Sequence, residues 1–389
     1  MKELAFETRT SQLGRDRRES AGFVNVPPYR GSTVLFPKAE DLDDTYRRKL
    51  KGENVMTYGT DGSPIHQKFY EAMNNLEGGC GTWAYATGLA GCVIPFFAFV
   101  HSGSHVLVTD SVYGPTRDFC ETILSKMGVE TEFYEPLIGA GIEKLIRPNT
   151  ALIFMESPGT HSFEVQDVPA IVKVAKAHNV WTMIDNTWAT PLFFNPLKIG
   201  VDVCIHAITK YIGGHSDLLM STATCNEKSW PLVEQVSHTM GQMTSADDIF
   251  LALRGLRSLK VRVEQQSRSC REIVAWLKQQ PQVSRIYYPA DVDDPGYEIW
   301  KRDFRGATAL FAFEFIEGTT KEQIYRFLNS LQLFGMGYSW GGYESLIIPS
   351  YGKRTVSTKT DFSRMLRLSI GLENSRDLIE DLKRGFSAL

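Results

Sequence analysis

Short apolar runs alternate with helix-like stretches through the middle of the chain. The apolar runs predict strands, and they are HVLVTD (105–110), VETEFYE (129–135), ALIFME (151–156), VWTMID (180–185) and VDVCIHA (201–207). The stretches around them predict helices, at 66–79, 88–103, 116–127 and 168–179. Apolar strands separated by helices indicate an α/β fold with a mostly parallel sheet that is covered on both faces.

The pattern changes at both ends of this alternating region. Residues 1–60 are polar and irregular, and we expect them to form an arm that lies on a neighbouring subunit. Residues 61–256 form the predicted main domain. Residues 247–280 predict a long helix, broken or bent near Gly255, that leads out of this domain.

The last part of the chain, residues 257–389, predicts a smaller α/β domain. Its sparser apolar runs predict strands, and they are SRIYY, ATALFAFEF, SLIIPS and MLRLSIG. Helices are predicted at 321–330 and 375–387.

Composition narrows the class of protein. A chain of 389 residues with a net charge of −3 has no strong field of either sign, so nucleic acid and membrane surfaces are poor partners. The N-terminus has no apolar signal region, and the longest apolar run, Cys92–Val100, is too short to span a membrane. We therefore expect a cytoplasmic protein.

Cysteine and histidine positions do not predict a metal site. The six cysteines are scattered without a CxxC pair, and the eight histidines show no HExxH spacing. Reduced thiols that act as small core residues are the favoured interpretation. We expect no metal.

Chemically active residues follow the predicted strands. In sheets of this type the ligand lies beyond the carboxyl ends of the strands. Asp185 ends one strand, Ser157 follows another, and Lys210 comes just after a third. A lysine that is withdrawn from water has a lowered pKa, which suits an amine that forms a Schiff base. The alternative for Lys210 is a surface lysine at a strand end.

Three further positions suggest what such a lysine would hold. Asp185, as a carboxylate at a strand end, can keep the pyridine nitrogen of pyridoxal 5'-phosphate (PLP) protonated, although loop aspartates are common there. Thr87 and Gly88 precede a predicted helix whose free N–H groups favour an anion. Arg367 lies in an apolar run, where it pairs either with a substrate carboxylate or with an internal acid.

In their order along the chain, these segments resemble the Cys/Met-metabolism family of PLP enzymes, in the fold-type I, aspartate aminotransferase-like group. The matching segments extend nearly from end to end and are VNVPPYRGSTVLF, YGTDG, SVYGPTRDFC, MESPG, TMGQMTSADD, LRGLRSL, YSWGGYESL and RLSIGLE. The resemblance implies PLP as the cofactor, and a large domain with a mostly parallel sheet followed by a smaller α/β domain.

The resemblance also implies roles for individual residues. Lys210 would bind PLP covalently, Asp185 would pair with the ring nitrogen, and Tyr113 would stack on the ring and assist proton transfer. The phosphate would be held by Gly88, Leu89 and Thr209, and by Tyr58 from a neighbouring subunit. The substrate carboxylate would be framed by Arg367, Ser339, Trp340 and Tyr58. Thr60 stands where the family usually has an arginine in the phosphate clamp.

Within the family, the closest resemblance is to bacterial members that cleave cystathionine by β-elimination, to homocysteine, pyruvate and ammonia. MESPGTH lacks the Asn that γ-acting members carry after Ser-Pro, and YSWGGYES contains the Trp of the β-acting loop. Alternatives are a γ-acting or broad cysteine-S-conjugate lyase, an alanine racemase and a non-catalytic PLP-binding regulator. The resemblance further implies a homodimer, and pairing of two dimers to a homotetramer.

Overall fold

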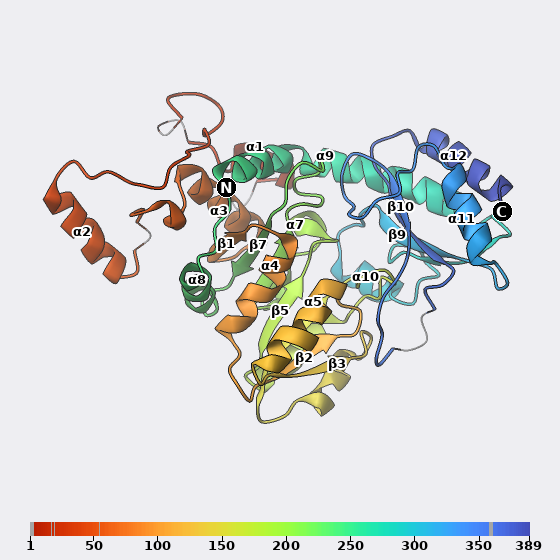
Figure 1. The fold of residues 1–389 in the computed structure, drawn as a ribbon, viewed down its shortest axis with the longest axis horizontal. Coiled ribbons are helices and arrows are strands. Elements are labelled where there is room, and N and C mark those ends of the chain that lie inside the picture. The colour runs from red at the N-terminus through yellow and green to blue at the C-terminus, as the bar shows by residue number, and fades with distance from the viewer. Residues whose placement is uncertain (1–3, 17, 19, 54, 358–360) are drawn as a thin grey trace.

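The computed structural model describes residues 4–16, 18, 20–53, 55–357 and 361–389 and contains a large and a small β-sheet (Figure 1). The large sheet has seven strands in the order β1-β7-β6-β5-β4-β2-β3. Their bounds are β1 Gly81–Tyr85, β2 His105–Thr109, β3 Glu130–Tyr134, β4 Thr150–Glu156, β5 Trp181–Asp185, β6 Val203–Ala207 and β7 Ser221–Cys225. The pairings from β3 through β6 are parallel, and those of β7 with β6 and β1 are antiparallel.

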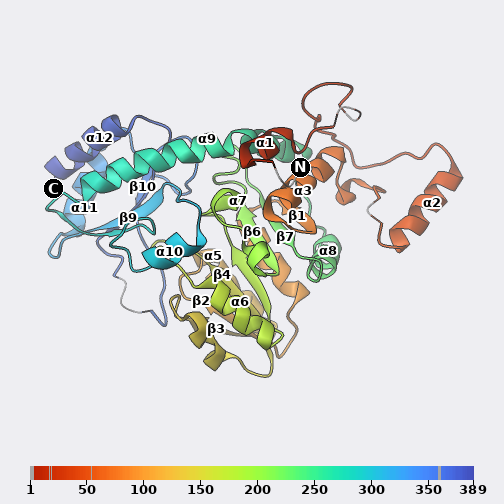
Figure 2. The same ribbon diagram turned by 180° about the vertical axis from the view of Figure 1, so that it is seen from behind.

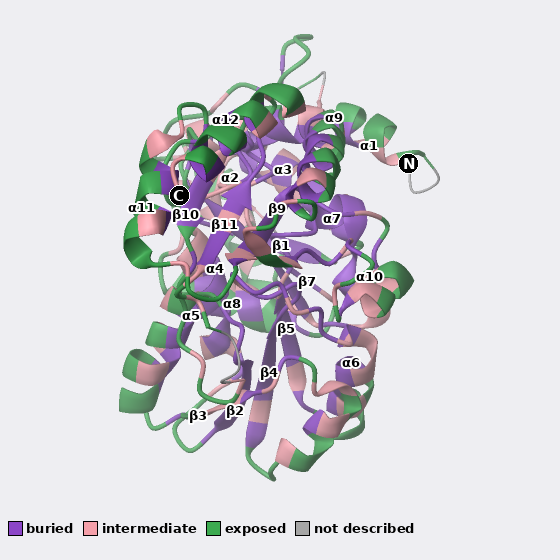
Figure 3. Cartoon of the chain, turned by 90° about the vertical axis from the view of Figure 1, so that its right-hand side faces the viewer, coloured by how far each residue is buried: buried purple, intermediate pink, exposed green. Residues whose placement is uncertain are grey.

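Helices cover both faces of the large sheet, as the sequence predicts. Helices α4, α5 and α8 lie on one face, and α6 lies on the other (Figures 1 and 2). The helical segments of this region are α3 Pro64–Glu77, α4 Gly88–Val93, η2 Ile94–Ala98, α5 Gly114–Phe119, η3 Cys120–Leu124, η4 Gly139–Leu145, α6 Val168–Ala177, α7 Thr190–Phe193, η5 Pro196–Ile199 and α8 Trp230–Thr239. Buried residues gather on the strands between these layers (Figure 3).

Two strands of the large sheet are missing from the sequence prediction. Strands β1 and β7 contain small and hydroxyl-bearing residues, GTWAY and STATC, and so lack the apolar run that marks the others. Their polar side chains satisfy one another inside the protein: the hydroxyl oxygens of Thr82 and Thr224 lie 2.9 Å apart across the β1–β7 pair. Buried hydroxyl pairs of this kind cost little once they are hydrogen-bonded.

The long helix α9, which connects the two sheets, differs from the sequence prediction at Gly255. Helix α9, Ala246–Leu277, is unbroken through Gly255, so the break that the sequence allowed there is not found, and a bend at Gly255 stays a prediction. A side chain at Gly255 would place its Cβ 2.3 Å from the carbonyl oxygen of Ile212 and 2.4 Å from that of Gly213. The glycine therefore permits close packing of α9 against the segment that follows Lys210, and it does not end the helix.

The small sheet has four antiparallel strands in the order β10-β11-β9-β8. These strands are β8 Val283–Tyr287, β9 Leu310–Phe315, β10 Leu346–Pro349 and β11 Met365–Ser369, and the helices beside them are α10 Tyr297–Asp303, α11 Lys321–Ser330 and α12 Ser375–Ser387. The mixture of strands and helices agrees with the predicted smaller α/β part. The boundaries at residues 60 and 256 stay predictions.

The N-terminal segment is not irregular, in contrast to the sequence prediction. It contains helices α1 Phe6–Gln12 and α2 Ala39–Leu50 and the short turn η1 Gly59–Asp61. Helix α1 packs against α9, whereas α2 has no buried residue and stands away from the body (Figures 1 and 2). Its apolar residues Leu42, Tyr46 and Leu50 have helical spacing but are all exposed, and the sequence prediction did not include this helix. Among the described residues, no helix is long and apolar enough to cross a membrane.

Candidate active site

A cavity of about 740 Å³ lies at the carboxyl ends of β4, β5 and β6. Its walls come from both halves of the chain. The predicted site residues that line it are Gly88, Leu89, Tyr113, Asp185, Thr209, Lys210, Ser339, Trp340 and Arg367. The fold thus gathers in one place residues that are separated by up to several hundred positions in the sequence, as the strand-end argument predicts.

Lys210 is positioned by the turn that follows β6. Its Nζ donates a hydrogen bond of 2.7 Å to the Ser339 hydroxyl and lies 5.5 Å from the centre of the Trp340 ring. Withdrawal from water, and then the charge of Arg367, lower the pKa of the Lys210 amine to about 8, although Asp185 opposes the shift. Roughly a tenth of this lysine is therefore neutral, and nucleophilic, at pH 7, which is far more than for an ordinary lysine.

Ser339 connects the lysine to the predicted carboxylate receptor. Its carbonyl oxygen accepts a 2.9 Å hydrogen bond from Nη2 of Arg367, while its hydroxyl accepts the bond from Lys210. The backbone of Ser339 has a φ of +83°, which is uncommon for a residue other than glycine and costs free energy. No carboxylate of the described residues is among the charged groups that act on Arg367, so the internal salt bridge considered as its alternative is not found there.

Asp185 ends β5 with one oxygen held and the other nearly free. Its Oδ1 accepts hydrogen bonds from the backbone N–H and the hydroxyl of Thr187, at 2.9 and 2.5 Å. Its Oδ2 has a weak contact with the Cys92 thiol at 3.5 Å. Thr187 also accepts a bond of 2.8 Å from the Ala207 N–H, so it ties β5 to the end of β6. Sequence reasoning gave Thr187 no role.

Glu156 is a second acid at the strand ends, and it too was not predicted as a site residue. It pairs in register with Asp185 across β4 and β5, and its oxygens accept bonds from the Tyr113 N–H at 2.7 Å and the Thr160 hydroxyl at 2.5 Å. Burial and then the charge of Asp185 raise the pKa of Glu156 to about 8. Its position at the last residue of an apolar strand was the available signal.

Tyr113 stands at the start of α5, with its backbone fixed by Glu156 and its side chain 43% exposed at the cavity. Burial is the main cause of a raised pKa for its phenol, so the hydroxyl keeps its proton at neutral pH. A protonated phenol at the cavity wall can donate a hydrogen bond or a proton.

The predicted phosphate-binding segment lies where α4 begins. Thr87 caps this helix by accepting a bond from the Ala90 N–H at 3.1 Å, and the first N–H groups of a helix have no partner within it. A Cβ on Gly88 would lie 3.2 Å from that of Ala207, so a larger residue would crowd the site. The Thr209 hydroxyl lines the cavity but already exchanges hydrogen bonds with the backbone of Met220.

Three residues that the sequence singled out lie outside this cavity. Tyr58 is 51% exposed and Thr60 is also exposed, and neither is part of the cavity wall. Their predicted action on the phosphate of a neighbouring subunit stays a prediction. Ser157 is fully buried, and its hydroxyl accepts a bond of 3.0 Å from the Gln166 N–H, which is a structural contact.

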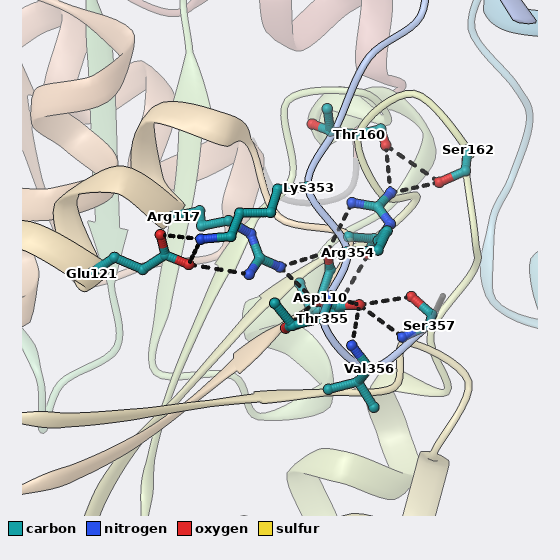
Figure 4. A network of polar contacts seen from close by, with 12 residues as sticks. Asp110, Arg117, Glu121, Thr160, Ser162, Lys353, Arg354, Thr355, Val356 and Ser357 are labelled. Atoms are coloured by element: carbon teal, nitrogen blue, oxygen red, sulfur yellow. Dashed lines mark hydrogen bonds and ion pairs between the residues drawn. The ribbon is translucent and has the colours of Figure 1, made fainter. Parts of the chain in front are cut away.

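A loop before β11 contributes Gly352, Lys353 and Arg354 to the cavity wall, and Figure 4 shows the polar contacts that hold this loop. The buried carboxylate of Asp110 accepts hydrogen bonds from the backbone N–H groups of Thr355, Val356 and Ser357, at 2.8 to 3.1 Å. The guanidinium of Arg354 donates to the carbonyl oxygens of Asp110 and Thr160. These bonds fix the small sheet's loop to the large sheet, and so fix the cavity wall that the loop forms.

One group of potential metal ligands lies away from the cavity. Glu77, Cys204 and His206 are all buried, and their ligand atoms lie close together. A short hydrogen bond of 2.5 Å between His206 Nε2 and Glu77 Oε1 already pairs two of them and links α3 to β6. The prediction that the chain holds no metal stays a prediction.

The cavity has the features that PLP requires. It offers an amine of lowered pKa, a strand-end carboxylate with one available oxygen, a helix that begins at a glycine, and a guanidinium that has no acidic partner among the described residues. Its volume lies within the range of small-molecule sites. Fold and site together define a PLP-dependent enzyme of the α/β class.

Comparison with known proteins gives the family. The model of the Cys/Met metabolism PLP-dependent enzymes matches residues 7–387, so the chain belongs to this family. Cystathionine beta-lyase MetC of Escherichia coli strain K12 is 40% identical, with 100% of both chains covered, and an L-alanine/L-glutamate racemase of Wolbachia pipientis wMel is 34% identical, with 97% and 96% covered. A crystal structure of cystathionine gamma-lyase from Lactobacillus plantarum complexed with L-serine has a TM-score of 0.88, with 29% identity and 99% of each chain covered. The predicted family, fold, cofactor and enzyme class are confirmed.

Proposed function

We propose that the protein is a carbon–sulfur lyase that cleaves L-cystathionine, and related cysteine S-conjugates, by β-elimination. The observation that carries the proposal is the meeting of Lys210 and Arg367 at Ser339, 2.7 and 2.9 Å from its hydroxyl and carbonyl oxygens. An amino acid whose carboxylate binds Arg367 has its Cα within reach of the Lys210 amine. The β-lyase of E. coli, at 40% identity over the whole chain, supports the choice of substrate.

The residues of the chain then have distinct tasks. Arg367 and Ser339 hold the substrate carboxylate, and Asp185 keeps the ring nitrogen of the cofactor protonated through its available oxygen. PLP, when bound, supplies an electron sink for the electron pair left at Cα. The Lys210 amine, once displaced by the substrate amine, removes the Cα proton, and its lowered pKa raises the fraction that is in the basic form near neutral pH.

Loss of the Cα proton is followed by loss of the sulfur from Cβ. The Cβ–S bond breaks, and the sulfur leaves with a proton as homocysteine. Hydrolysis of the remaining three-carbon fragment with one water gives pyruvate and ammonia. Lys210 and the phenol of Tyr113 are the two groups at the cavity wall that can carry the protons.

A second candidate is amino-acid racemisation, which needs proton donors on the two faces of Cα. Tyr113 favours it, because its raised pKa keeps a proton available in the cavity that also holds Lys210. The Wolbachia racemase supports the same alternative at 34% identity. A γ-acting lyase is the third, supported by the fold of the L. plantarum enzyme.

Product analysis separates these functions. Incubation with L-cystathionine should yield pyruvate and homocysteine in equal amounts. Cysteine with 2-oxobutyrate would instead indicate γ-elimination. D-alanine formed from L-alanine, without pyruvate from L-cystathionine, would indicate a racemase and contradict the proposal.

We also propose a homodimer with an active site at its interface, with pairs of dimers forming a tetramer, in the cytoplasm. The N-terminal segment supports this arrangement, because several of its apolar side chains are exposed in the single chain. The most exposed are Phe23, Leu35 and Leu50, at 77, 87 and 70%. Apolar side chains of this kind are usually covered in obligate interfaces, which bury roughly 2,000 Å² or more.

A further inference from the structure

His161 is a buried cavity residue to which neither the sequence nor the mechanism gives a role. It lines the cavity and is 4% exposed. Its ring packs on that of Tyr351, with centres 4.7 Å apart, and meets Phe362 edge-on at 6.3 Å. A polar ring enclosed in this way normally has hydrogen-bond partners inside the protein.

The backbone around His161 fixes the direction of its side chain. The residue has a φ of +65°, and its neighbours are held by bonds from the Thr160 N–H to the Ser111 carbonyl at 2.8 Å and from Arg354 to the Thr160 carbonyl at 3.0 Å. A left-handed backbone costs free energy for a non-glycine residue, and it persists where the surroundings determine it. Residues in such conformations concentrate at functional sites.

The hydrogen bonding of the imidazole is incomplete. Its Nδ1 is sealed from solvent and has no partner among the described residues. Because Nδ1 is the sealed nitrogen of a ring that lines the cavity, Nε2 is the nitrogen that a bound ligand meets. A proton on Nδ1 would be a buried donor without an acceptor, so the favoured tautomer carries its proton on Nε2.

The charges that face the ring also favour this form. Burial, followed by the charges of Arg367 and Arg354, lowers the pKa of His161 to about 3, so the imidazole is neutral at physiological pH. Tyr351, the remaining titratable group against the ring, has a raised pKa and is neutral there too. The cavity thus presents a neutral N–H donor beside a guanidinium that has no acidic partner in the described chain.

We propose that His161 is a second donor, through Nε2–H, for the carboxylate that Arg367 receives. The inference rests on the proposed function only in that the ligand is an α-amino acid. It assigns to this chain a positioning residue that acts on the substrate carboxylate and leaves the proton transfers to Lys210.

The test compares two ligands that differ in the carboxylate. L-alanine and ethylamine both react with the cofactor through an amine, and neither has a β-leaving group. Their dissociation constants are measured from the change in cofactor absorbance for the wild type and for the variants His161→Phe and His161→Gln. The control is His178→Gln, an exposed histidine that bonds Glu143 far from the cavity.

His161→Phe keeps the aromatic contact with Tyr351 and removes the donor. It should raise the dissociation constant of L-alanine on the order of ten-fold, which is the usual effect of losing a hydrogen bond to a charged group, and leave the dissociation constant of ethylamine unchanged. His161→Gln retains a neutral N–H and should recover part of the loss, and the control should match the wild type. Equal L-alanine binding by wild type and His161→Phe, or equal weakening of both ligands, overturns the proposal.

Two additions keep the test decisive. If His161→Phe does not load PLP, His161→Asn replaces it, because asparagine tolerates a positive φ and its shorter side chain withdraws the donor. For the wild type, the dissociation constant of ethylamine divided by that of L-alanine should also stay constant between about pH 5.5 and 7.5, since a neutral His161 does not titrate there. A ratio that falls as pH rises through about 6.5 would mean a charged imidazole and would contradict the neutral donor. Because L-alanine cannot undergo elimination, failure here is distinct from failure of the proposed lyase activity.

Discussion

The Nζ of Lys210 lies 2.7 Å from the hydroxyl oxygen of Ser339, a residue more than a hundred positions further along the chain. The same serine accepts a hydrogen bond from Arg367 through its carbonyl oxygen. A single residue with a left-handed backbone therefore sets the distance between the reactive amine and the carboxylate receptor. The position of the Lys210 amine therefore depends on the loop that carries Ser339, as well as on the large sheet that carries the lysine.

The first prediction concerns the pH at which Lys210 becomes reactive. Since the pKa of this cation is lowered to about 8, the neutral amine becomes dominant as pH rises above that value. The rate at which PLP attaches covalently to the apoenzyme should therefore rise through about pH 8 and then level off. Arg367→Gln removes a charge that lowers this pKa, so its profile should move to higher pH. Identical profiles for the two proteins, followed by cofactor absorbance, would show that Arg367 does not influence the amine.

The second prediction concerns Asp185. Asp185→Asn should retain PLP and lower turnover on the order of 10²-fold or more, because an amide cannot keep the ring nitrogen protonated. The matched control is Asp202→Asn, which alters a strand-supporting carboxylate that bonds Thr182 outside the cavity. Turnover and bound PLP are measured on the same samples. Wild-type turnover for Asp185→Asn would reduce Asp185 to a loop-capping residue.

The third prediction concerns how the protonation of Glu156 makes the stability of the protein depend on pH. Its pKa of about 8 is raised above the unfolded value of 4.5, so the native state binds its proton more tightly. Wild-type free energy of unfolding should fall, relative to Glu156→Gln, as pH rises from about 4.5 to 8, and the difference should level off above that range. Denaturant titrations of both proteins at several pH values measure it. A difference that grows in the opposite direction would mean that Glu156 is ionised in the folded protein.

The assembly prediction uses the exposed N-terminal segment. Leu35→Asp should weaken the dimer and lower PLP occupancy, because a charge would enter the apolar interface. Val292→Asp is the control, since Val292 is also exposed, at 67%, but lies on the opposite half of the chain. Tyr58→Phe should lower PLP occupancy without changing assembly, because it removes one phosphate-binding hydroxyl. Sedimentation and cofactor content are measured together, and a fully loaded, active monomer would refute the interface site.

The sequence predicted those parts of the molecule whose pattern is local. Strands β2, β4, β5 and β6 have apolar runs, and Lys210 and Asp185 are placed by the strands they follow. The contact of Lys210 with Ser339 could not be predicted, because it depends on how two distant loops pack. Thr187 and Glu156 were missed for a related reason: their roles arise from hydrogen bonds across neighbouring strands.

The missed helix α2 illustrates a different limit. Its apolar residues Leu42, Tyr46 and Leu50 recur every four positions, but none of them is buried in the single chain, and they lie in a segment that is otherwise polar. His161 lies in MESPGTH, where the sequence signal is the absence of an asparagine, and its burial, positive φ and unpaired nitrogen exist only in the folded chain. Sequence pattern therefore gave the groups that we propose to react, and three-dimensional packing gave the residues that we propose to position them.

The central claim, that Lys210 holds the cofactor and moves the Cα proton, is tested most directly by borohydride reduction of the loaded enzyme followed by peptide mapping. The account predicts a pyridoxyl label on the peptide that contains Lys210, and neither label nor turnover of L-cystathionine in Lys210→Ala. A label on another lysine of the wild type, or a reducible cofactor link retained by an active Lys210→Ala enzyme, would contradict it.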